Sequence, residues 1–198
     1  MKTREAVLGV MLSGTGRTLE NLLGHIRRGS LRARLGLVVA SRECRGAQIA
    51  RDAGVPVVVE PGRIAAQRLE SLLLAHDIDL VVLAGYLQLV SVPRAFRGRV
   101  VNMHPALLPD FGGPGMFGRR VHEAVLAAGK RETGCTVHLC GDEYDTGPIV
   151  LQKTCPVLPG DTPDTLAARV FDLECQAYPE ALGLLIRNLT PPQAGARA

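Results

Sequence analysis

Tryptophan is absent from this chain of 198 residues, and the other aromatic residues are limited to four Phe and three Tyr. No stretch of the sequence interleaves Lys or Arg with several aromatic residues. Because proteins that bind single-stranded nucleic acid stack aromatic side chains on the bases within a basic groove, we predict no nucleic-acid partner. The net charge of +4 is compatible with a small anionic substrate.

No apolar run in the sequence has the length of a membrane span. Residues 6–12 are apolar and follow Lys2 and Arg4, but this run is at the short limit for a signal peptide, and a glycine-rich turn follows it at once. We therefore predict a first strand at this position, no membrane partner and a cytoplasmic protein.

Signatures of disulfides, metals and serine hydrolases are also missing. The Cys residues are odd in number and form no Cys-x-x-Cys pair, which predicts reduced thiols. A metal site is disfavoured because the candidate ligands show neither the i, i+4 spacing of a zinc protease helix nor a local His/Cys cluster. These candidates are His104, His122, His138, Asp142 and Asp145. A serine hydrolase is disfavoured because Gly-x-Ser-x-Gly does not occur.

Strand-like apolar runs alternate with helix-like segments in the first half of the chain, which predicts an α/β fold. We expect strands at residues 6–12, 35–40, 55–59, 79–84 and 100–103, and helices at 18–28, 46–53 and 64–75. This alternation implies a Rossmann-like, three-layer domain with a mostly parallel, twisted sheet and helices on both faces. Ligands then bind at the carboxyl ends of the strands.

The second half of the chain is less regular. We expect a helical turn at 93–96, a loop at 107–118, a helix at 121–128 and strands at 133–139 and 149–157. Thr162 is a suitable N-cap before Pro163, so we predict a long helix from there to about residue 185, kinked or broken at Pro179. Residues 1–188 then form a single domain, and residues 189–198 form a disordered tail.

The turn Ser13-Gly-Thr-Gly-Arg-Thr18 joins the first strand to the first helix. Glycines let the backbone approach a ligand, and the free N–H groups and dipole of a helix N-terminus favour an anion. The turn is not a Walker loop, and Leu19 replaces the third glycine of a dinucleotide fingerprint. From these residues alone, both a phosphate site and a plain capped turn stay open.

Asn102 and His104 end the strand that starts at Val100, and their spacing of two points both side chains to one side of an extended strand. Further along, Asp145 begins the turn sequence Asp-Thr-Gly-Pro. An amide, an imidazole and a carboxylate at one sheet edge are the groups that acyl transfer uses. Taken singly, each of these residues is equally well explained as a turn or strand-end residue.

Together these motifs resemble the folate-dependent formyltransferases. The resemblance rests on Ser-Gly-x-Gly-x-x-Leu from residue 13, Asn-x-His-Pro-x-Leu-Leu-Pro at 102–109, Gly-Cys-Thr-Val-His at 134–138 and Asp-x-Gly-Pro-Ile at 145–149. It extends to about residue 185 and is closest to the members that formylate phosphoribosylglycinamide in purine (IMP) synthesis. The length is that of a catalytic domain alone, so we expect neither the C-terminal domain of methionyl-tRNA formyltransferase nor the N-terminal domain of formyltetrahydrofolate deformylase.

The resemblance implies a transferase that uses 10-formyltetrahydrofolate as co-substrate and no metal. Its implied catalytic residues are Asn102, His104 and Asp145. Its implied contacts to phosphoribosylglycinamide are Gly16, Arg17, Thr18, Arg63 and Glu174, although the segment around Arg63 fits the family pattern poorly. Its implied folate contacts are Leu87, Gln88, Leu89, Val90, Asn102, Gly141, Asp142, Glu143 and Tyr144. Arg17, Thr18 and Gln88 depart from residues common in the family.

In the implied reaction the substrate amine attacks the formyl carbon, and Asn102 and a protonated His104 stabilise the oxyanion. Asp145 is expected to keep His104 charged by raising its pKa. Two alternatives stay open. One is another formyl-group enzyme of this fold, such as formyltetrahydrofolate deformylase or a sugar-nucleotide formyltransferase, and the other is a non-catalytic nucleotide-binding module. We expect small-molecule partners and a monomer or homodimer.

Overall fold

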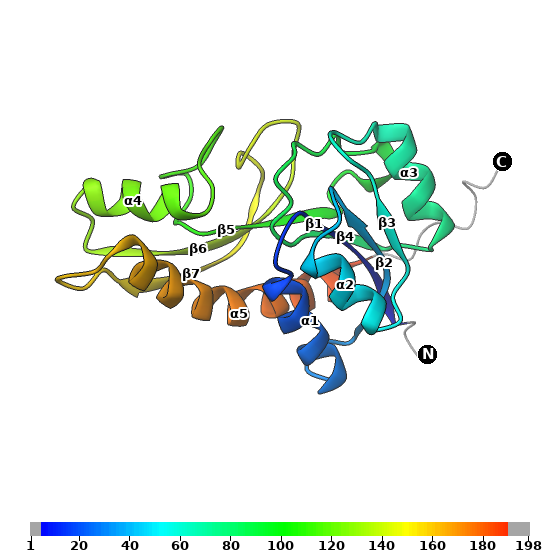
Figure 1. The fold of residues 1–198 in the computed structure, drawn as a ribbon, viewed down its shortest axis with the longest axis horizontal. Coiled ribbons are helices and arrows are strands. Elements are labelled where there is room, and N and C mark those ends of the chain that lie inside the picture. The colour runs from blue at the N-terminus through cyan, green and yellow to red at the C-terminus, as the bar shows by residue number, and fades with distance from the viewer. Residues whose placement is uncertain (1–4, 190–198) are drawn as a thin grey trace.

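The structure, a computed structural model, describes residues 5–189 and has an α/β fold (Figure 1). Within these residues, strands form a sheet in the order β3-β2-β1-β4-β5-β6-β7. The strands are β1 (Ala6–Leu12), β2 (Ala33–Ala40), β3 (Val57–Val59), β4 (Leu80–Leu83), β5 (Val100–His104), β6 (Glu132–Leu139) and β7 (Ile149–Pro156). The helices are α1 (Arg17–Arg27), α2 (Arg45–Asp52), α3 (Ala66–Ala75), the 3₁₀ turn η1 (Arg94–Phe96), α4 (Arg119–Ala127) and α5 (Pro163–Asn188).

The sheet changes direction after β5. Strands β1 to β5 pair in parallel, whereas β6 and β7 run antiparallel. The predicted α/β fold with a mostly parallel sheet is therefore confirmed. Because β6 runs back along β5, Asn102 is paired with His138, and His104 with Thr136. This pairing brings a second strand to the candidate site.

The alternation of side chains along β1 divides the core into two layers. Leu8, Val10 and Leu12 pack in a cluster with α1, α2 and α5, whereas Val7 and Met11 pack in a cluster with α3 and η1. Figure 1 shows α1, α2 and α5 on one side of the sheet and α3 on the other. The three-layer arrangement follows from apolar strands that are buried on both faces.

The long helix α5 begins as the sequence predicts, with Thr162 as N-cap and Pro163 in the first turn. Of the kink or break predicted at Pro179, the break is wrong, because α5 continues to Asn188 as one helix, and the kink stays a prediction. Proline has no N–H to donate to the carbonyl of Cys175, four residues earlier. Asn21 of α1 donates its Nδ2 to that carbonyl at 2.9 Å. A side chain from a neighbouring helix thus replaces the missing bond.

The predicted disordered tail lies outside the described residues from position 190 onward, so it stays a prediction. The other predicted elements are all present, and their bounds differ from the prediction by a few residues at most.

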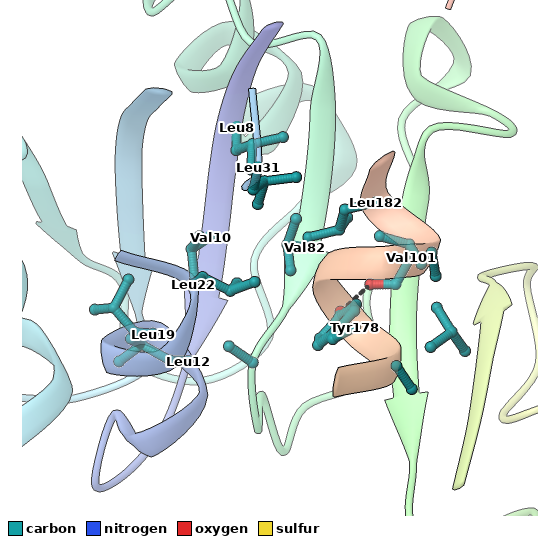
Figure 2. Packing of buried hydrophobic residues seen from close by; sticks show 14 of the residues in the cluster. Leu8, Val10, Leu12, Leu19, Leu22, Leu31, Val82, Val101, Tyr178 and Leu182 are labelled. Carbon is teal, nitrogen blue, oxygen red and sulfur yellow. Dashed lines mark hydrogen bonds between the residues drawn. The ribbon is translucent and has the colours of Figure 1, made fainter. Parts of the chain in front are cut away.

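Tyr178 anchors α5 to the middle of the sheet (Figure 2). The side chain is fully buried, and its hydroxyl oxygen lies 2.8 Å from the carbonyl oxygen of Leu83 and 3.0 Å from that of Val101. Leu83 is the last residue of β4, and Val101 directly precedes Asn102 on β5, so this anchor holds α5 against the two strands that carry the candidate site.

We expect Tyr178→Phe to lower the free energy of unfolding by about 1–3 kcal/mol, because it leaves buried carbonyl groups without their donor. Chemical denaturation followed by circular dichroism measures this loss. Tyr86→Phe is the matched control, since the buried Tyr86 hydroxyl has no hydrogen-bond partner among residues 5–189. A loss in Tyr178→Phe no larger than in the control would contradict the anchoring role.

Candidate active site

A cavity of about 330 Å³ opens at the carboxyl ends of β4 and β5. Its walls come from the start of α1, the loops after β4 and β5, the β6–β7 loop and α5. A smaller cavity of about 60 Å³ lies beside it. The two cavities share the lining residues Leu83, Tyr86, Asn102, Tyr144 and Asp145. This is the sheet edge at which the fold predicts a ligand.

The three predicted catalytic residues converge on the carboxylate of Asp145. Its Oδ1 lies 3.5 Å from Nδ2 of Asn102, and its Oδ2 lies 3.5 Å from Nδ1 of His104. The backbone N–H of Gly113 donates to Oδ2 at 3.0 Å, and His138 Nε2 lies 3.4 Å from Oδ1. Burial alone raises the pKa of Asp145, but His138, the Gly113 N–H and His104 bring the pKa below its usual value. Asp145 is therefore ionised at neutral pH.

The turn sequence after Cys140 explains how this carboxylate reaches the site. Asp145 has a φ of 57°, a left-handed conformation that Asp tolerates better than most residues. Gly147 follows it, and a Cβ atom there would overlap the carbonyl oxygen of Leu139. The Asp-Thr-Gly-Pro sequence thus lets the chain turn tightly between β6 and β7 while the Asp145 side chain points inward.

His104 is almost fully buried, and Phe111 fixes its orientation. Its Nε2 lies 2.8 Å from the carbonyl oxygen of Phe111, and a carbonyl only accepts, so Nε2 carries a proton. The other ring nitrogen, Nδ1, therefore faces Asp145.

Asp145 raises the pKa of His104, as expected, but the expectation that His104 is held charged is wrong, because the net shift of its pKa is downward. Burial lowers the pKa more strongly than Asp145 and the Phe111 carbonyl raise it, and His138 lowers it further. The free protein therefore holds mostly neutral His104 at neutral pH.

His138 is the site residue that the sequence does not identify. It is buried, and its Nε2 lies 3.2 Å from Asn102 Nδ2 as well as close to Asp145. The alternation along β6 leaves open whether this residue is in the core or faces the site. The missing information is the register between β5 and β6, which pairs His138 with Asn102.

Of the glycine-rich turn at residues 13–18, Thr18 alone lines the larger cavity, and Gly16 and Arg17 do not. Gly16 is the N-cap of α1 with a φ of 79°, and a Cβ atom there would lie 2.6 Å from the Cα of Gly46. Thr18 lines the cavity, whereas Arg17 is exposed and its guanidinium lies 3.6 Å from the centre of the Phe171 ring. Only glycine fits at position 16, so the backbone N–H groups that follow it stay accessible.

Glu174 of α5 lines the same cavity. Burial raises its pKa to about 7, although the nearby Arg17 opposes this shift. The carboxyl group of Glu174 therefore changes its charge near neutral pH, where a ligand can set its protonation state.

The predicted folate contacts divide between the two cavities. Leu87 and Tyr144 line the larger one. The smaller one is lined by Gln88, Leu89, Val90, Gly141, Glu143 and Tyr144 among others.

Arg63 and Asp142 line neither cavity. Arg63 Nε donates to Ser91 Oγ at 3.2 Å. Ser91 follows Val90, which lines the smaller cavity. Asp142 lies 3.9 Å from Arg97. The roles predicted for Arg63 and Asp142 stay predictions.

The five cysteines are free thiols. Over residues 5–189, no cluster of three or more His, Cys, Asp or Glu side chains has an arrangement that holds a metal ion. No helix in that range combines the length and apolar character needed to span a membrane.

Comparison with known proteins matches most of this chain to two plant proteins. It is 41% identical over 191 residues to a chloroplastic phosphoribosylglycinamide formyltransferase of Vigna unguiculata, covering 92% of this chain and 61% of the relative. It is 39% identical to the Arabidopsis thaliana protein of the same name, covering 92% and 66%. The chain thus spans less than two thirds of the length of these two relatives.

A solved structure, glycinamide ribonucleotide transformylase 1 of Symbiobacterium toebii, superimposes with a TM-score of 0.85 at 35% identity. The match covers 96% of this chain and 91% of that one. Residues 7–182 match the formyl transferase family. The chain therefore belongs to the formyl transferase family.

Proposed function

We propose that this chain transfers the formyl group of 10-formyltetrahydrofolate to the amine of 5'-phosphoribosylglycinamide. The observation that carries this proposal is the position of Asn102 and Asp145 in the wall shared by two adjacent cavities, with His104 beside them. A group transfer between two bound molecules needs its catalytic groups at such a boundary. The names of the two plant relatives support phosphoribosylglycinamide as the acceptor of the formyl group.

The amine substrate fits the larger cavity. Its phosphate would bind the N-terminus of α1 at Gly16 to Thr18, where free N–H groups and the helix dipole favour an anion. Glu174, at the side of the same cavity, would accept hydrogen bonds from the hydroxyl or amino groups of the substrate. In this arrangement the amine would lie toward Asn102 and His104.

The formyl donor fits the second cavity and the adjoining loop. Leu89, Val90 and Cys140 give this cavity an apolar wall that suits a flat aromatic ring. Its polar rim includes Gln88 and Glu143, which can hydrogen-bond to ring nitrogens and amino groups. The formyl carbon would then lie at the shared wall.

The reaction needs a bond from the amine nitrogen to the formyl carbon, and then cleavage of the bond from that carbon to the folate nitrogen. As the amine attacks, the amine nitrogen becomes positive and the formyl oxygen becomes negative. The Nδ2 group of Asn102 can donate to this oxygen, and ionised Asp145 stabilises the positive charge.

The proton must then move from the amine to the folate nitrogen. Because Nε2 of His104 is held by Phe111, its unprotonated Nδ1 is the nitrogen that can accept this proton. The imidazolium that forms lies 3.5 Å from Asp145 and can donate the proton to the leaving nitrogen. Neutral His104, which burial favours, is thus the form that starts this path.

The direct test is a spectrophotometric assay of 10-formyltetrahydrofolate turnover, with and without phosphoribosylglycinamide. Turnover that requires the amine and yields the formylated amine supports the proposal. Release of formate without the amine would instead indicate a deformylase, and no turnover would indicate a binding module.

We expect Asp145→Asn to lower kcat by about 10²–10³-fold, comparable to the loss of an oxyanion donor. The amide cannot stabilise the positive amine or the His104 imidazolium. Steady-state kinetics with both substrates measures this effect, and Asp172→Asn, an exposed carboxyl on α5 that lines neither cavity, is the control. Near-normal kcat in Asp145→Asn would remove Asp145 from the mechanism.

We expect the dephosphorylated substrate to bind about 10²-fold more weakly than phosphoribosylglycinamide, because it loses charge-assisted hydrogen bonds to the turn. Arg17→Ala should weaken binding of the phosphorylated form about tenfold and leave the other form unchanged. Arg27→Ala, at the opposite end of α1, is the matched control. Equal affinity for the two forms would exclude a phosphate site at the turn.

We expect the affinity for phosphoribosylglycinamide to rise as the pH increases through about 7, where Glu174 ionises. Donors on the substrate favour the ionised carboxylate, so binding lowers the pKa of Glu174 and releases a proton. Calorimetry in buffers of different ionisation enthalpy measures that proton. Glu174→Gln should abolish the release, whereas Asp172→Asn, exposed on the same helix, should not. An unchanged release in Glu174→Gln would contradict this role.

A further inference from the structure

Phe111, in the loop between β5 and α4, has a backbone conformation that is unusual for a bulky residue. Its φ is 57°, in the left-handed region that favours glycine. In the described part of the chain, only two other non-glycine residues, Asp77 and Asp145, have a positive φ. Aspartate tolerates this region because its short polar side chain can hydrogen-bond locally. Phenylalanine has no such compensation, so the contacts around Phe111 must hold it there.

The carbonyl group of Phe111 makes the first of these contacts. Its oxygen lies 2.8 Å from Nε2 of the buried His104. A carbonyl oxygen only accepts, so Nε2 carries a proton whether the ring is neutral or charged. The other nitrogen, Nδ1, lies 3.5 Å from Asp145 Oδ2. The backbone at Phe111 therefore determines which ring nitrogen of His104 faces Asp145.

The next two residues run along the side chain of Asp145. A Cβ atom at Gly112 would lie 3.2 Å from the Cβ of Asp145, so the backbone passes close to this side chain. One residue later, the N–H of Gly113 donates to Asp145 Oδ2 at 3.0 Å. Residues 111–113 thus hold His104 through a carbonyl and Asp145 through an N–H. Both bonds come from the backbone, so they depend on its conformation.

The side chain of Phe111 has different partners. It packs, partly buried, against the core and lines neither cavity. Lys130, which precedes β6, places its Nζ 5.7 Å from the centre of the Phe111 ring and 2.9 Å from Oδ2 of the neighbouring Asp110. These contacts hold the loop on the side away from His104 and Asp145. Any effect of Phe111 on the reaction must therefore pass through those two residues.

We propose that Phe111 is a positioning residue that acts through its backbone. Its left-handed conformation holds His104 Nε2 with the carbonyl oxygen and brings the N–H of Gly113 to Asp145, so that His104 presents Nδ1 to the carboxylate. This inference rests on the proposed function for the reaction in which the two side chains act. It assigns Phe111 no contact with substrate.

Two substitutions at position 111 separate the backbone from the side chain. Asparagine removes the ring but tolerates the left-handed region, whereas isoleucine keeps an apolar side chain but is β-branched and strongly disfavoured there. We expect Phe111→Asn to keep kcat within about fivefold of the wild type and Phe111→Ile to lower it about 10²-fold, because displacing reacting groups by about 1 Å has an effect of that size. KM for both substrates should change little.

A packing role would give the reverse order, with Phe111→Asn the poorer enzyme. That order, or a loss confined to KM, would overturn the proposal. Phe111→Asn decides the matter even where Phe111→Ile does not fold, since a loss of about 10²-fold in the asparagine variant would contradict a role of the backbone alone.

Asp77→Ile is the matched control for backbone strain. Asp77 has a φ of 54° and lies just before β4, at the sheet edge opposite the site. Isoleucine meets the same backbone conflict at both positions, so both variants should be less stable in chemical denaturation. Only Phe111→Ile should lose kcat per folded molecule. Comparable losses of kcat in the two variants would attribute the effect to stability and overturn the proposal.

Nitrogen NMR of His104 in the ligand-free protein tests the geometry without any reaction. We expect a protonated Nε2 in the wild type and in Phe111→Asn at neutral pH. In Phe111→Ile the carbonyl is displaced, so the proton should shift to Nδ1, which faces the Asp145 carboxylate. An unprotonated Nε2 in the wild type, or an unchanged spectrum in Phe111→Ile, would overturn the proposal.

Formyl transfer by the wild type tests the proposed function separately. An inactive protein whose His104 spectra follow the expected pattern would refute that function and leave the backbone role of Phe111 established.

Discussion

The buried carboxylate of Asp145 is the constraint on which the site depends. An ionised carboxylate away from water is stable only when several donors or positive groups surround it. Here β5 supplies Asn102 and His104, the loop between β5 and α4 supplies the N–H of Gly113, and β6 supplies His138. The reversal of strand direction after β5 has a direct role in this arrangement, because it places His138 opposite Asn102.

Helix α5 couples the two ends of the substrate cavity. Tyr178 binds it to Leu83 of β4 and Val101 of β5, and Asn21 of α1 binds it at the carbonyl of Cys175. Glu174 lies one turn before Tyr178 on α5, and Thr18 lies one turn before Asn21 on α1. The two helices that line this cavity are therefore joined close to the lining residues, so the distance across the cavity is set by rigid elements rather than by loops.

Local sequence patterns were sufficient to predict most of the fold. The unbroken apolar run at residues 6–12 predicts β1, and Thr162-Pro163 predicts the start of α5. What failed depended on partners distant in sequence. Pro179 is accommodated because of Asn21, which is 154 residues away. Whether the pKa of His104 is raised or lowered depends on how deeply the ring is buried. Whether His138 faces the site depends on the register between β5 and β6. Neither can be deduced from the order of residues.

The neutral state of His104 in the free protein changes the charge of the site. The resemblance to the family predicted a protonated His104 beside Asp145, which would leave the pair nearly neutral before substrate binds. Ionised Asp145 beside a neutral His104 instead leaves this pair with a net negative charge. Such a site favours the amine as it becomes positive, and it offers Nδ1 of His104 to the proton that the amine must lose. The imidazolium then exists only while the oxyanion and the leaving nitrogen need it, which concentrates stabilisation on the transition state.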